Sequence, residues 1–212
     1  YELVIFDWDG TLMDSISKNV TCMQQMAQTL SIDTPTEQAV RDVIGLSMEE
    51  ALKTLYPLKS VLDFEPMINS YKEHYLTLNS TPSPLFDGSA VLLNELRSMD
   101  YRLAVATGKG RNGLNRVLTE TNLGHYFESS RCADESKSKP NPDMIFELLE
   151  ELKVKPESAV MIGDSLHDLN MANNAGIDSV GVSYGAHSES TLLLAKPKAI
   201  IHQPLELLQI LR

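Results

Sequence analysis

Two aspartates with one residue between them follow an apolar run near the start of the chain. Residues 3–6 are all apolar, and Asp7 and Asp9 come next. So short an apolar run predicts a strand buried on both faces of a parallel sheet. If the chain stays extended, both carboxylates face one crevice. Asp7, ionised and bound to a metal, could then act as a nucleophile, and Asp9 could donate and accept protons. Turn or N-cap roles are the alternative.

Two further segments carry groups that can hold a phosphate. Thr107 and Gly108 follow a second apolar run and offer a hydroxyl and a backbone N–H at the start of a loop that leads into a helix. Lys139 precedes Pro140-Asn141-Pro142, a stiff, extended segment. An ammonium fixed there offsets negative charge on a nucleophile and on a transferring group. An ordinary Thr-Gly turn and a solvated loop lysine are the alternatives.

Two more acids follow a third apolar run, residues 159–162. Gly163 and Asp164 come directly after this run, and Asp168 lies four residues beyond Asp164. Mg²⁺ prefers oxygen ligands, which Asp164, Asp7 and the backbone carbonyl of Asp9 can supply. Asp168 lies one helical turn later, where it can hold metal-bound water or Lys139. An acid that stabilises a helix N-terminus is the competing interpretation of Asp168.

The pattern of apolar residues predicts how these groups are positioned. From residue 84 onward, helices and strands alternate, which predicts a parallel sheet with helices on both faces. Because the carboxyl ends of parallel strands share one edge, Asp7, Thr107 and Asp164 should meet there. The expected strands are 3–6, 103–106, 129–133, 159–162, 179–182 and 199–201. The expected helices after residue 84 lie near 92–99, 114–124, 142–152 with Asn141 as N-cap, 166–175 before Gly176, and 204–211.

Residues 14–83 read as helices only. One apolar stripe runs from residue 16 to residue 30, and a capping box beginning at Thr34 opens a helix that ends near Gly45. A second capping box begins at Ser47, and a further helix carries an apolar face from Met67 to Leu78. These segments predict a small helical bundle inserted after the first strand.

Four segments together resemble the motifs of the haloacid dehalogenase superfamily, in their order. They are Asp7-Trp8-Asp9-Gly10-Thr11-Leu12, Thr107, Lys139-Pro140-Asn141-Pro142 and Gly163-Asp164-Ser165-Leu166-His167-Asp168. The chain looks most like the phosphoglycolate phosphatase group. The resemblance implies an α/β fold: a Rossmann-like parallel core of residues 1–13 and 84–212, with a helical cap of residues 14–83.

The resemblance also implies a mechanism. Asp7 would attack phosphorus. Asp9 would protonate the leaving alcohol and then activate the water that hydrolyses the intermediate. Thr107, Lys139 and Mg²⁺ would stabilise the negative charge. The cap would choose the substrate through a contact loop that contains Gly45 and Ser47. On the core side, Gly108, Lys109 and Arg111 are candidates for substrate contacts, although surface charges at a helix start are an equal alternative for the two cations.

The function expected is therefore hydrolysis of a small phosphomonoester, phosphoglycolate-like or a sugar phosphate, through an aspartyl-phosphate. A sugar-phosphate mutase of the β-phosphoglucomutase type stays open, because it would keep Asp9 and trap a bisphosphate under the cap. A catalytically silent binding protein on the same fold is a further alternative. The substrate itself is not readable, because the phosphoryl site is generic.

Composition limits the partners and the compartment. The 212 residues include 42% hydrophobic residues and carry a formal net charge of -11, which argues against nucleic acid and anionic membranes as partners. Cys22 and Cys132 match no metal-ligand spacing, so two reduced, partly buried thiols are expected. We expect a cytoplasmic protein, monomer or homodimer, whose partner is a small phosphorylated metabolite.

Overall fold

A six-stranded parallel sheet forms the centre of the larger part of the molecule. The computed structural model describes residues 1–211. The strands run in the order β3-β2-β1-β4-β5-β6, so β1 lies inside the sheet between β2 and β4. The strand bounds are β1 Leu3–Phe6, β2 Arg102–Thr107, β3 Ser129–Cys132, β4 Ala159–Gly163, β5 Asp178–Val182 and β6 Ala199–Ile201.

The helices divide into those that cover the sheet and those that form an insertion between β1 and α5. Around the sheet they are α5 Ser89–Ser98, α6 Arg111–Thr121, η3 Gly124–Tyr126, α7 Asp143–Leu152, η4 Pro156–Ser158, α8 Leu166–Ala175, α9 Glu189–Leu192, η5 Leu193–Ala195, η6 Pro204–Glu206 and α10 Leu207–Ile210. In the insertion they are α1 Ile16–Thr29, α2 Glu37–Arg41, α3 Met48–Leu55, η1 Val61–Asp63, α4 Phe64–Glu73 and η2 His74–Leu78.

Alternate residues of β1 pack into two separate cores, which is why all four are apolar. Val4 and Phe6 belong to the core that includes residues of α5, α6 and α10, whereas Leu3 and Ile5 belong to the core with α7 and α8. None of the four is more than 1% exposed. A strand buried on both faces is typical of a parallel sheet between two helical layers. The sheet, its strands and the α/β class are as the sequence predicts.

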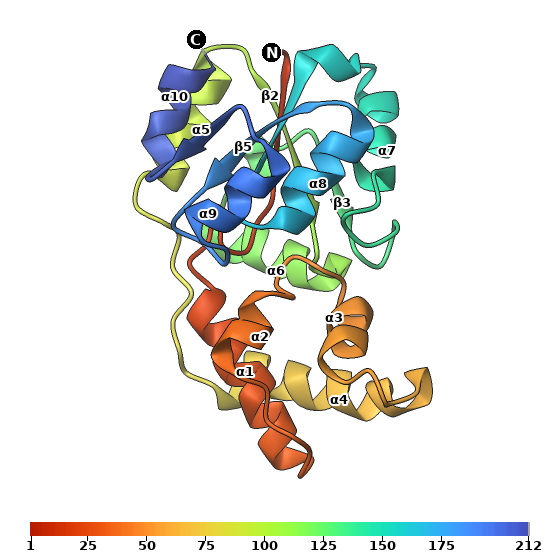
Figure 1. Cartoon of the computed structure of the whole chain (residues 1–212). Helices are drawn as coiled ribbons and strands as arrows, with labels where there is room; N and C mark the ends of the chain where they lie inside the picture. The colour runs from red at the N-terminus through yellow and green to blue at the C-terminus, as the bar shows by residue number, and fades with distance from the viewer. Residues whose placement is uncertain (212) are drawn as a thin grey trace.

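The helical insertion has a hydrophobic core of its own and lies beyond the carboxyl ends of the strands. Ile16, Met26, Val40, Leu52 and Phe64 belong to this core. Figure 1 shows α1 to α4 below the sheet, while both chain termini lie at the opposite end. The insertion therefore sits over the sheet edge at which the polar residues gather.

The two segments that join the insertion to the sheet run side by side. The N–H of Asp14 donates to the carbonyl of Pro84 at 2.7 Å, and the N–H of Phe86 donates to the carbonyl of Leu12 at 3.0 Å. Cys22 and Cys132 are both buried and free, as expected. Within residues 1–211, the helices lack the length and apolar character needed to cross a membrane.

Several predicted helix ends differ from the structure. The N-cap of α2 is Thr36, whose hydroxyl accepts from the N–H of Ala39, so the capping box expected at Thr34 is wrong. The residue in the left-handed conformation that ends α6 is Asn122 rather than Gly124. The short polar side chain of asparagine tolerates this conformation. The N-cap of α7 is Pro142, although the side chain of Asn141 accepts from the N–H of Asp143.

Leu78 was expected on the inner face of its helix, and this prediction is wrong. The last turn, η2, is a π-helix in which the N–H of Asn79 donates to the carbonyl of His74 at 2.8 Å. Five-residue hydrogen bonding adds a residue to the turn and rotates the end of the helix away from the α-helical face. Leu78 is consequently 60% exposed.

Candidate active site

Asp7 follows β1 directly and is buried without a hydrogen-bond donor. The residue is 1% exposed, and neither carboxylate oxygen accepts a hydrogen bond from a described residue. The Nζ atom of Lys139 lies 2.9 Å from Oδ1, which makes an ion pair without hydrogen-bond geometry. Burial raises the pKa of Asp7 to about 7, although Lys139 acts in the opposite direction. A buried carboxylate with free lone pairs is costly unless a ligand completes it.

Lys139 is held between two carboxylates. Its side chain is fully buried, and its Nζ atom lies 2.9 Å from Asp7 Oδ1 and 2.6 Å from Asp168 Oδ1. Burial alone would lower the pKa of Lys139, but the two carboxylates raise it. The ammonium is therefore a fixed positive charge beside Asp7.

Asp168 performs both roles that the sequence left open. Its Oδ2 atom accepts from the N–H and the hydroxyl of Ser165, which completes a capping box at the start of α8. Its Oδ1 atom accepts from Lys139. Because both oxygens are engaged, Asp168 positions Lys139 and the helix.

Asp164 follows β4 and faces Asp7 across the sheet edge. Its Oδ1 atom accepts from the Thr11 hydroxyl at 3.2 Å, and its Oδ2 atom accepts from the N–H of Ala186 at 2.7 Å. Burial and the neighbouring carboxylates of Asp168 and Asp7 raise the pKa of Asp164 well above its usual range. Sequence reasoning missed Thr11 and Ala186 as its partners, because Ala186 comes from a loop remote in the chain.

Asp7, Asp164 and Asp168 each have one carboxylate oxygen in a group whose members lie within 4.8 Å of one another. Three buried acids at that separation repel one another, which is unfavourable without a compensating cation. Lys139 supplies one positive charge. The oxygens of Asp7, which accept no hydrogen bond from residues 1–211, and those of Asp164 fit the oxygen-rich environment that a hard divalent cation such as Mg²⁺ prefers.

Asp9 faces away from this cluster towards the helical insertion. The Nζ atom of Lys109 lies 2.8 and 2.7 Å from its two carboxylate oxygens, and the Ser15 hydroxyl donates to Oδ1 at 2.6 Å. Burial acts to lower the pKa of Lys109, but Asp9 raises it overall. The same ammonium lies 5.3 Å from the ring centroid of Tyr75, so Lys109 connects the sheet to the insertion.

Thr107 and Gly108 lie where β2 meets the insertion. Thr107 is fully buried, and its hydroxyl accepts from the N–H of Lys109 at 3.2 Å. A side chain on Gly108 would begin 2.5 Å from the carbonyl oxygen of Gly45 and 2.6 Å from that of Leu46. Only glycine permits this approach, which brings the loop that contains Gly45 against Gly108.

Two predicted contact residues point elsewhere. The Arg111 guanidinium lies 2.6 Å from Glu135 and also donates to Ser130, on the side of α6 outside the cavity. The Ser47 hydroxyl accepts from the N–H of Glu50 and caps α3. Its N–H donates to Ser138 at 2.9 Å, which ties the insertion to the sheet domain. Both residues are thus occupied by structural contacts.

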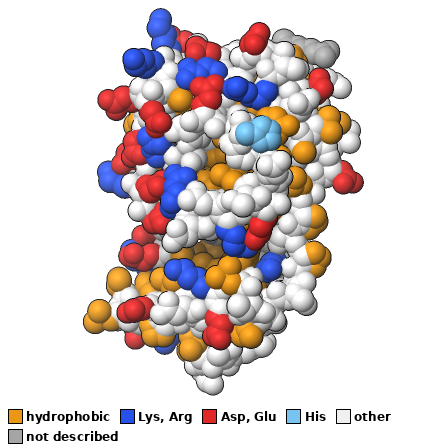
Figure 2. All heavy atoms as spheres, turned by 180° about the vertical axis from the view of Figure 1, so that it is seen from behind, with side chains coloured by type: hydrophobic (Ala, Val, Ile, Leu, Met, Phe, Trp, Pro, Cys, Tyr) orange, Lys and Arg blue, Asp and Glu red, His pale blue; other side chains and the backbone are white. Residues whose placement is uncertain are grey.

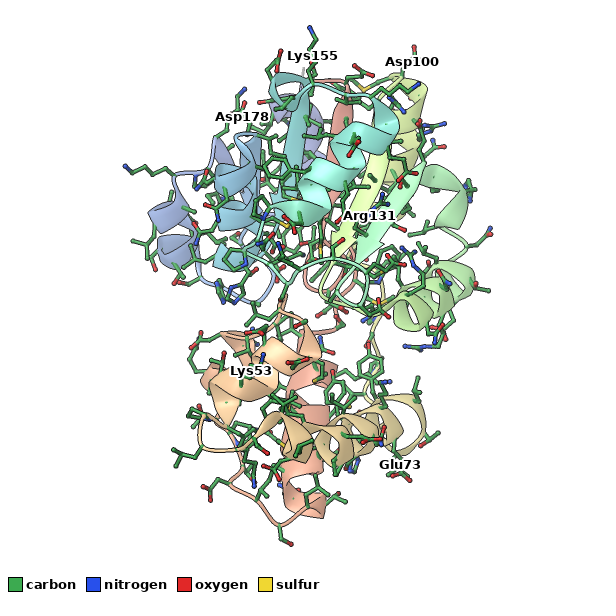
Figure 3. The ribbon with its side chains drawn as sticks, turned by 90° about the vertical axis from the view of Figure 1, so that its right-hand side faces the viewer. Lys53, Glu73, Asp100, Arg131, Lys155 and Asp178 are labelled. Carbon is green, nitrogen blue, oxygen red and sulfur yellow. The ribbon has the colours of Figure 1, made fainter. Side chains whose placement is uncertain are left out.

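A cavity of about 540 Å³ lies between the sheet edge and the insertion. Figure 2 shows the hollow from behind, with hydrophobic side chains inside it and basic side chains at its rim. Figure 3 shows side chains of the sheet-edge loops and of the insertion meeting in this region. The predicted residues that line the cavity are Asp7, Asp9, Gly45, Thr107, Gly108 and Lys109.

Most of the remaining lining residues were not foreseen as site residues. Asn19, Met23, Tyr71, Tyr75 and Arg116 are among them. The spacing of Tyr71 and Tyr75 indicates one helical face, but spacing does not distinguish a cavity wall from a core. Asn19 gives a weak signal, because a buried polar residue on an apolar stripe needs a partner, here the Tyr71 hydroxyl at 3.1 Å.

Comparison with known proteins agrees with this geometry. Residues 4–182 match the family model described as haloacid dehalogenase-like hydrolase. The chain is 32% identical to "Probable phosphatase IndB" of Dickeya dadantii, over 94% of this chain and 88% of that protein. It is 28% identical to phosphoglycolate phosphatase of Nitrosococcus oceani, over 99% and 96% of the two chains.

The fold has a close counterpart among solved structures. A haloacid dehalogenase-like family hydrolase from Streptococcus pneumoniae superposes with a TM-score of 0.85 at 26% identity, covering 100% of this chain and 98% of the other. The match includes the insertion as well as the sheet, because it covers the whole chain. The chain belongs to the haloacid dehalogenase-like hydrolase family, within the group that resembles phosphoglycolate phosphatases.

Proposed function

We propose that this hydrolase is a Mg²⁺-dependent phosphatase that releases phosphate from a small phosphomonoester through an aspartyl-phosphate. The observation that carries the proposal is Asp7, a buried carboxylate whose two oxygens accept no hydrogen bond among the described residues and which lines the cavity beside Lys139. A nucleophile needs such free lone pairs, whereas a structural acid would have its oxygens satisfied.

Asp7 is proposed to attack phosphorus and to displace the alcohol. Lys139, 2.9 Å from Asp7, offsets the charge that spreads over the phosphoryl oxygens. The Thr107 hydroxyl and the backbone of the loop after β2 are suited to hold those oxygens, since both segments line the cavity beside Asp7. These groups are fixed before the substrate arrives, so little reorganisation is needed.

Asp9 is proposed to protonate the leaving oxygen and then to activate the hydrolytic water. Its carboxylate lines the cavity on the side of the insertion, where the leaving group would lie. Lys109 and Ser15 hold this carboxylate in place. One group can serve both steps, because the proton taken up from water is the one given to the next leaving group.

Asp7 and Asp164, with the backbone carbonyl of Asp9, are proposed to hold Mg²⁺. When bound, the cation would neutralise negative charge that develops on the phosphoryl group. It would also offset the repulsion among the buried acids. Asp168 then acts through Lys139 and Ser165.

Residues 14–83 are proposed to act as a cap domain that excludes water and selects the substrate. Gly45 and Leu46 contact Gly108, and the side chain of His167 donates to the carbonyl of Asp42 at 2.8 Å. With the contact between Ser47 and Ser138, these interactions hold the cap over the site. Gly45, Gly108 and Lys109 remain proposed substrate contacts, and Arg111 and Ser47 are no longer included.

A mutase finds less support in the cavity than a phosphatase. A mutase must hold a second, unreactive phosphate under its cap, which calls for several cations there. Among the described cavity residues, Lys72 is the one charged side chain that the cap contributes. The substrate is proposed to be a small phosphorylated metabolite; the cytoplasmic location and the monomeric or dimeric state stay predictions.

The test is phosphate release from p-nitrophenyl phosphate and a panel of phosphate esters, including phosphoglycolate and sugar phosphates. The protein is measured with Mg²⁺ and with EDTA, beside an Asp7→Asn variant. Release that requires Mg²⁺ and is lost in the variant is the expected result. Absence of release from every ester, with Mg²⁺ present and the protein folded, would leave a mutase or a binding role in its place.

A further inference from the structure

The two ends of the cavity have opposite chemical character. At the sheet edge its walls are Asp7, Asp9 and Thr107. The walls that the cap contributes are mainly apolar side chains from α1, α2, α3 and the turn between α2 and α3. They are Met23, Val40, Val43, Ile44, Leu46, Met48 and Ala51. We call this end the apolar end of the cavity.

Most residues of the apolar end are shielded from water, whereas Leu46 and Met48 are half-buried. Met23, Val40, Val43 and Ala51 are each no more than 5% exposed. The cavity holds about 540 Å³, a volume in the range of about 300–1,000 Å³ that is typical of pockets for drug-sized ligands. A two-carbon acid such as glycolate would leave most of this space unfilled.

The cations around the cavity are poorly placed to receive a carboxylate at the apolar end. Lys72 lines the cavity but is exposed to solvent. The ammonium of Lys109 already contacts both oxygens of Asp9. Arg116 is half-buried, and its guanidinium lies 3.1 Å from Glu120 and 5.5 Å from the ring centroid of Tyr75, so it too is already engaged. A carboxylate moved into the apolar end would therefore lose its hydration without gaining a counter-ion.

We propose that the leaving group of the substrate has an apolar body, alkyl or aromatic, which occupies the apolar end while the phosphoryl group lies at Asp7. This inference rests on the proposed phosphatase function and narrows its substrate class. It disfavours phosphoglycolate and unmodified sugar phosphates, because both would place charged or hydroxylated groups against apolar walls.

A series of straight-chain alkyl phosphates tests the proposal without changing the reactivity of the leaving group. Ethyl, butyl and hexyl phosphate differ in buried methylenes, and each methylene should raise kcat/KM by about fourfold until the cavity is filled. Phosphoglycolate should lie below ethyl phosphate. A flat series, or phosphoglycolate as the best ester, would overturn the proposal.

Two variants in the cap test where the alkyl chain of the substrate binds. Ala51→Phe fills the apolar end, and Met48→Glu places a charge there at a helix start that tolerates acids. Both should reduce the ratio of kcat/KM between hexyl and ethyl phosphate to near one. Leu58→Glu is the matched control, because Leu58 lies in the cap but is fully exposed; its ratio should equal that of the wild type.

The outcomes separate this proposal from the one on which it rests. If the protein hydrolyses p-nitrophenyl phosphate but both cap variants, folded by circular dichroism and thermal unfolding, keep the wild-type ratio, the apolar end is not the leaving-group site. If no ester, including p-nitrophenyl phosphate, is hydrolysed in the presence of Mg²⁺, the phosphatase function itself fails.

Discussion

The two ends of the cavity are built on different principles. At the sheet edge, charged groups are fixed by specific partners: Lys139 lies between Asp7 and Asp168, and Asp164 accepts from Thr11 and Ala186. At the apolar end, side chains such as Met23 and Met48 contribute shape and hydrophobicity, and methionine adapts readily to different ligands. We therefore expect the proposed chemistry to depend on a few specific contacts and the proposed choice of substrate to depend on many weak ones.

The largest expected effect at the sheet edge, short of removing the nucleophile, comes from Asp9→Asn. With ethyl phosphate the variant should lose roughly 10²–10⁴-fold in kcat/KM, because an amide cannot transfer the proton. With p-nitrophenyl phosphate the loss should be smaller, since that leaving group departs without full protonation. Steady-state phosphate release with both esters measures this difference. Equal losses would argue against proton transfer by Asp9.

Lys139→Met should destabilise the protein as well as inactivate it. The variant leaves Asp7 and Asp168 buried without their shared cation, which should cost about 3–5 kcal/mol in the free energy of unfolding. Urea denaturation checks this value. Lys137→Met is the control: Lys137 is 71% exposed and pairs with Asp143, so that variant should change stability by less than about 1 kcal/mol. Similar losses in both variants would contradict the fixed role of Lys139.

Asp7 should make the metal-free protein less stable as the pH rises. Its pKa is raised on folding from 3.8 to about 7, so in this window the folded state binds more protons than the unfolded state. The free energy of unfolding therefore falls as the pH increases from 3.8 to about 7.

Asp7→Asn removes this titration. In EDTA at pH 8 the variant should unfold at a higher temperature than the wild type, and added Mg²⁺ should stabilise the wild type more than the variant. Thermal unfolding at pH 5 and pH 8 measures both effects. A lower unfolding temperature for the variant in EDTA at pH 8 would show that Asp7 is not destabilised by its burial.

The smallest expected effect is that of Ser47→Ala. Ser47 lies where the insertion contacts the sheet domain through Ser138. Loss of the N-cap of α3 should cost about 1 kcal/mol in the free energy of unfolding, as should Thr36→Ala at α2. Because the Ser47 hydroxyl does not line the cavity, KM should stay the same for all esters. A selective rise in KM for one ester would restore Ser47 as a substrate contact.

This contrast explains what could be predicted from the sequence. Asp7, Thr107 and Asp164 each follow an apolar run. The rule that the carboxyl ends of parallel strands share one edge was therefore enough to predict that they lie close together. The sheet and its helical layers result from the same alternation. Lys139 needed its proline-rich context and the family resemblance as well.

Several features that the sequence patterns do not predict depend on packing or on local departures from regular helix geometry. Arg111 begins α6 next to Lys109, but Glu135 draws its guanidinium away from the cavity. Leu78 does not lie on the inner face, because residues 74–78 form a π-helical turn, which the local sequence pattern does not predict. The apolar end was missed because Met23 and Val40 have the spacing of ordinary core residues, and only the packing of the helices leaves a cavity beside them.

The role of Asp7 as nucleophile can be tested most directly by trapping the phosphorylated enzyme. The Asp9→Asn variant is mixed with Mg²⁺ and p-nitrophenyl phosphate, quenched in acid and analysed by peptide mass spectrometry. Because hydrolysis is slowed more than attack in this variant, the peptide that contains Asp7 should carry one phosphoryl group. Phosphate release without any adduct, or an adduct on another residue, would contradict attack by Asp7.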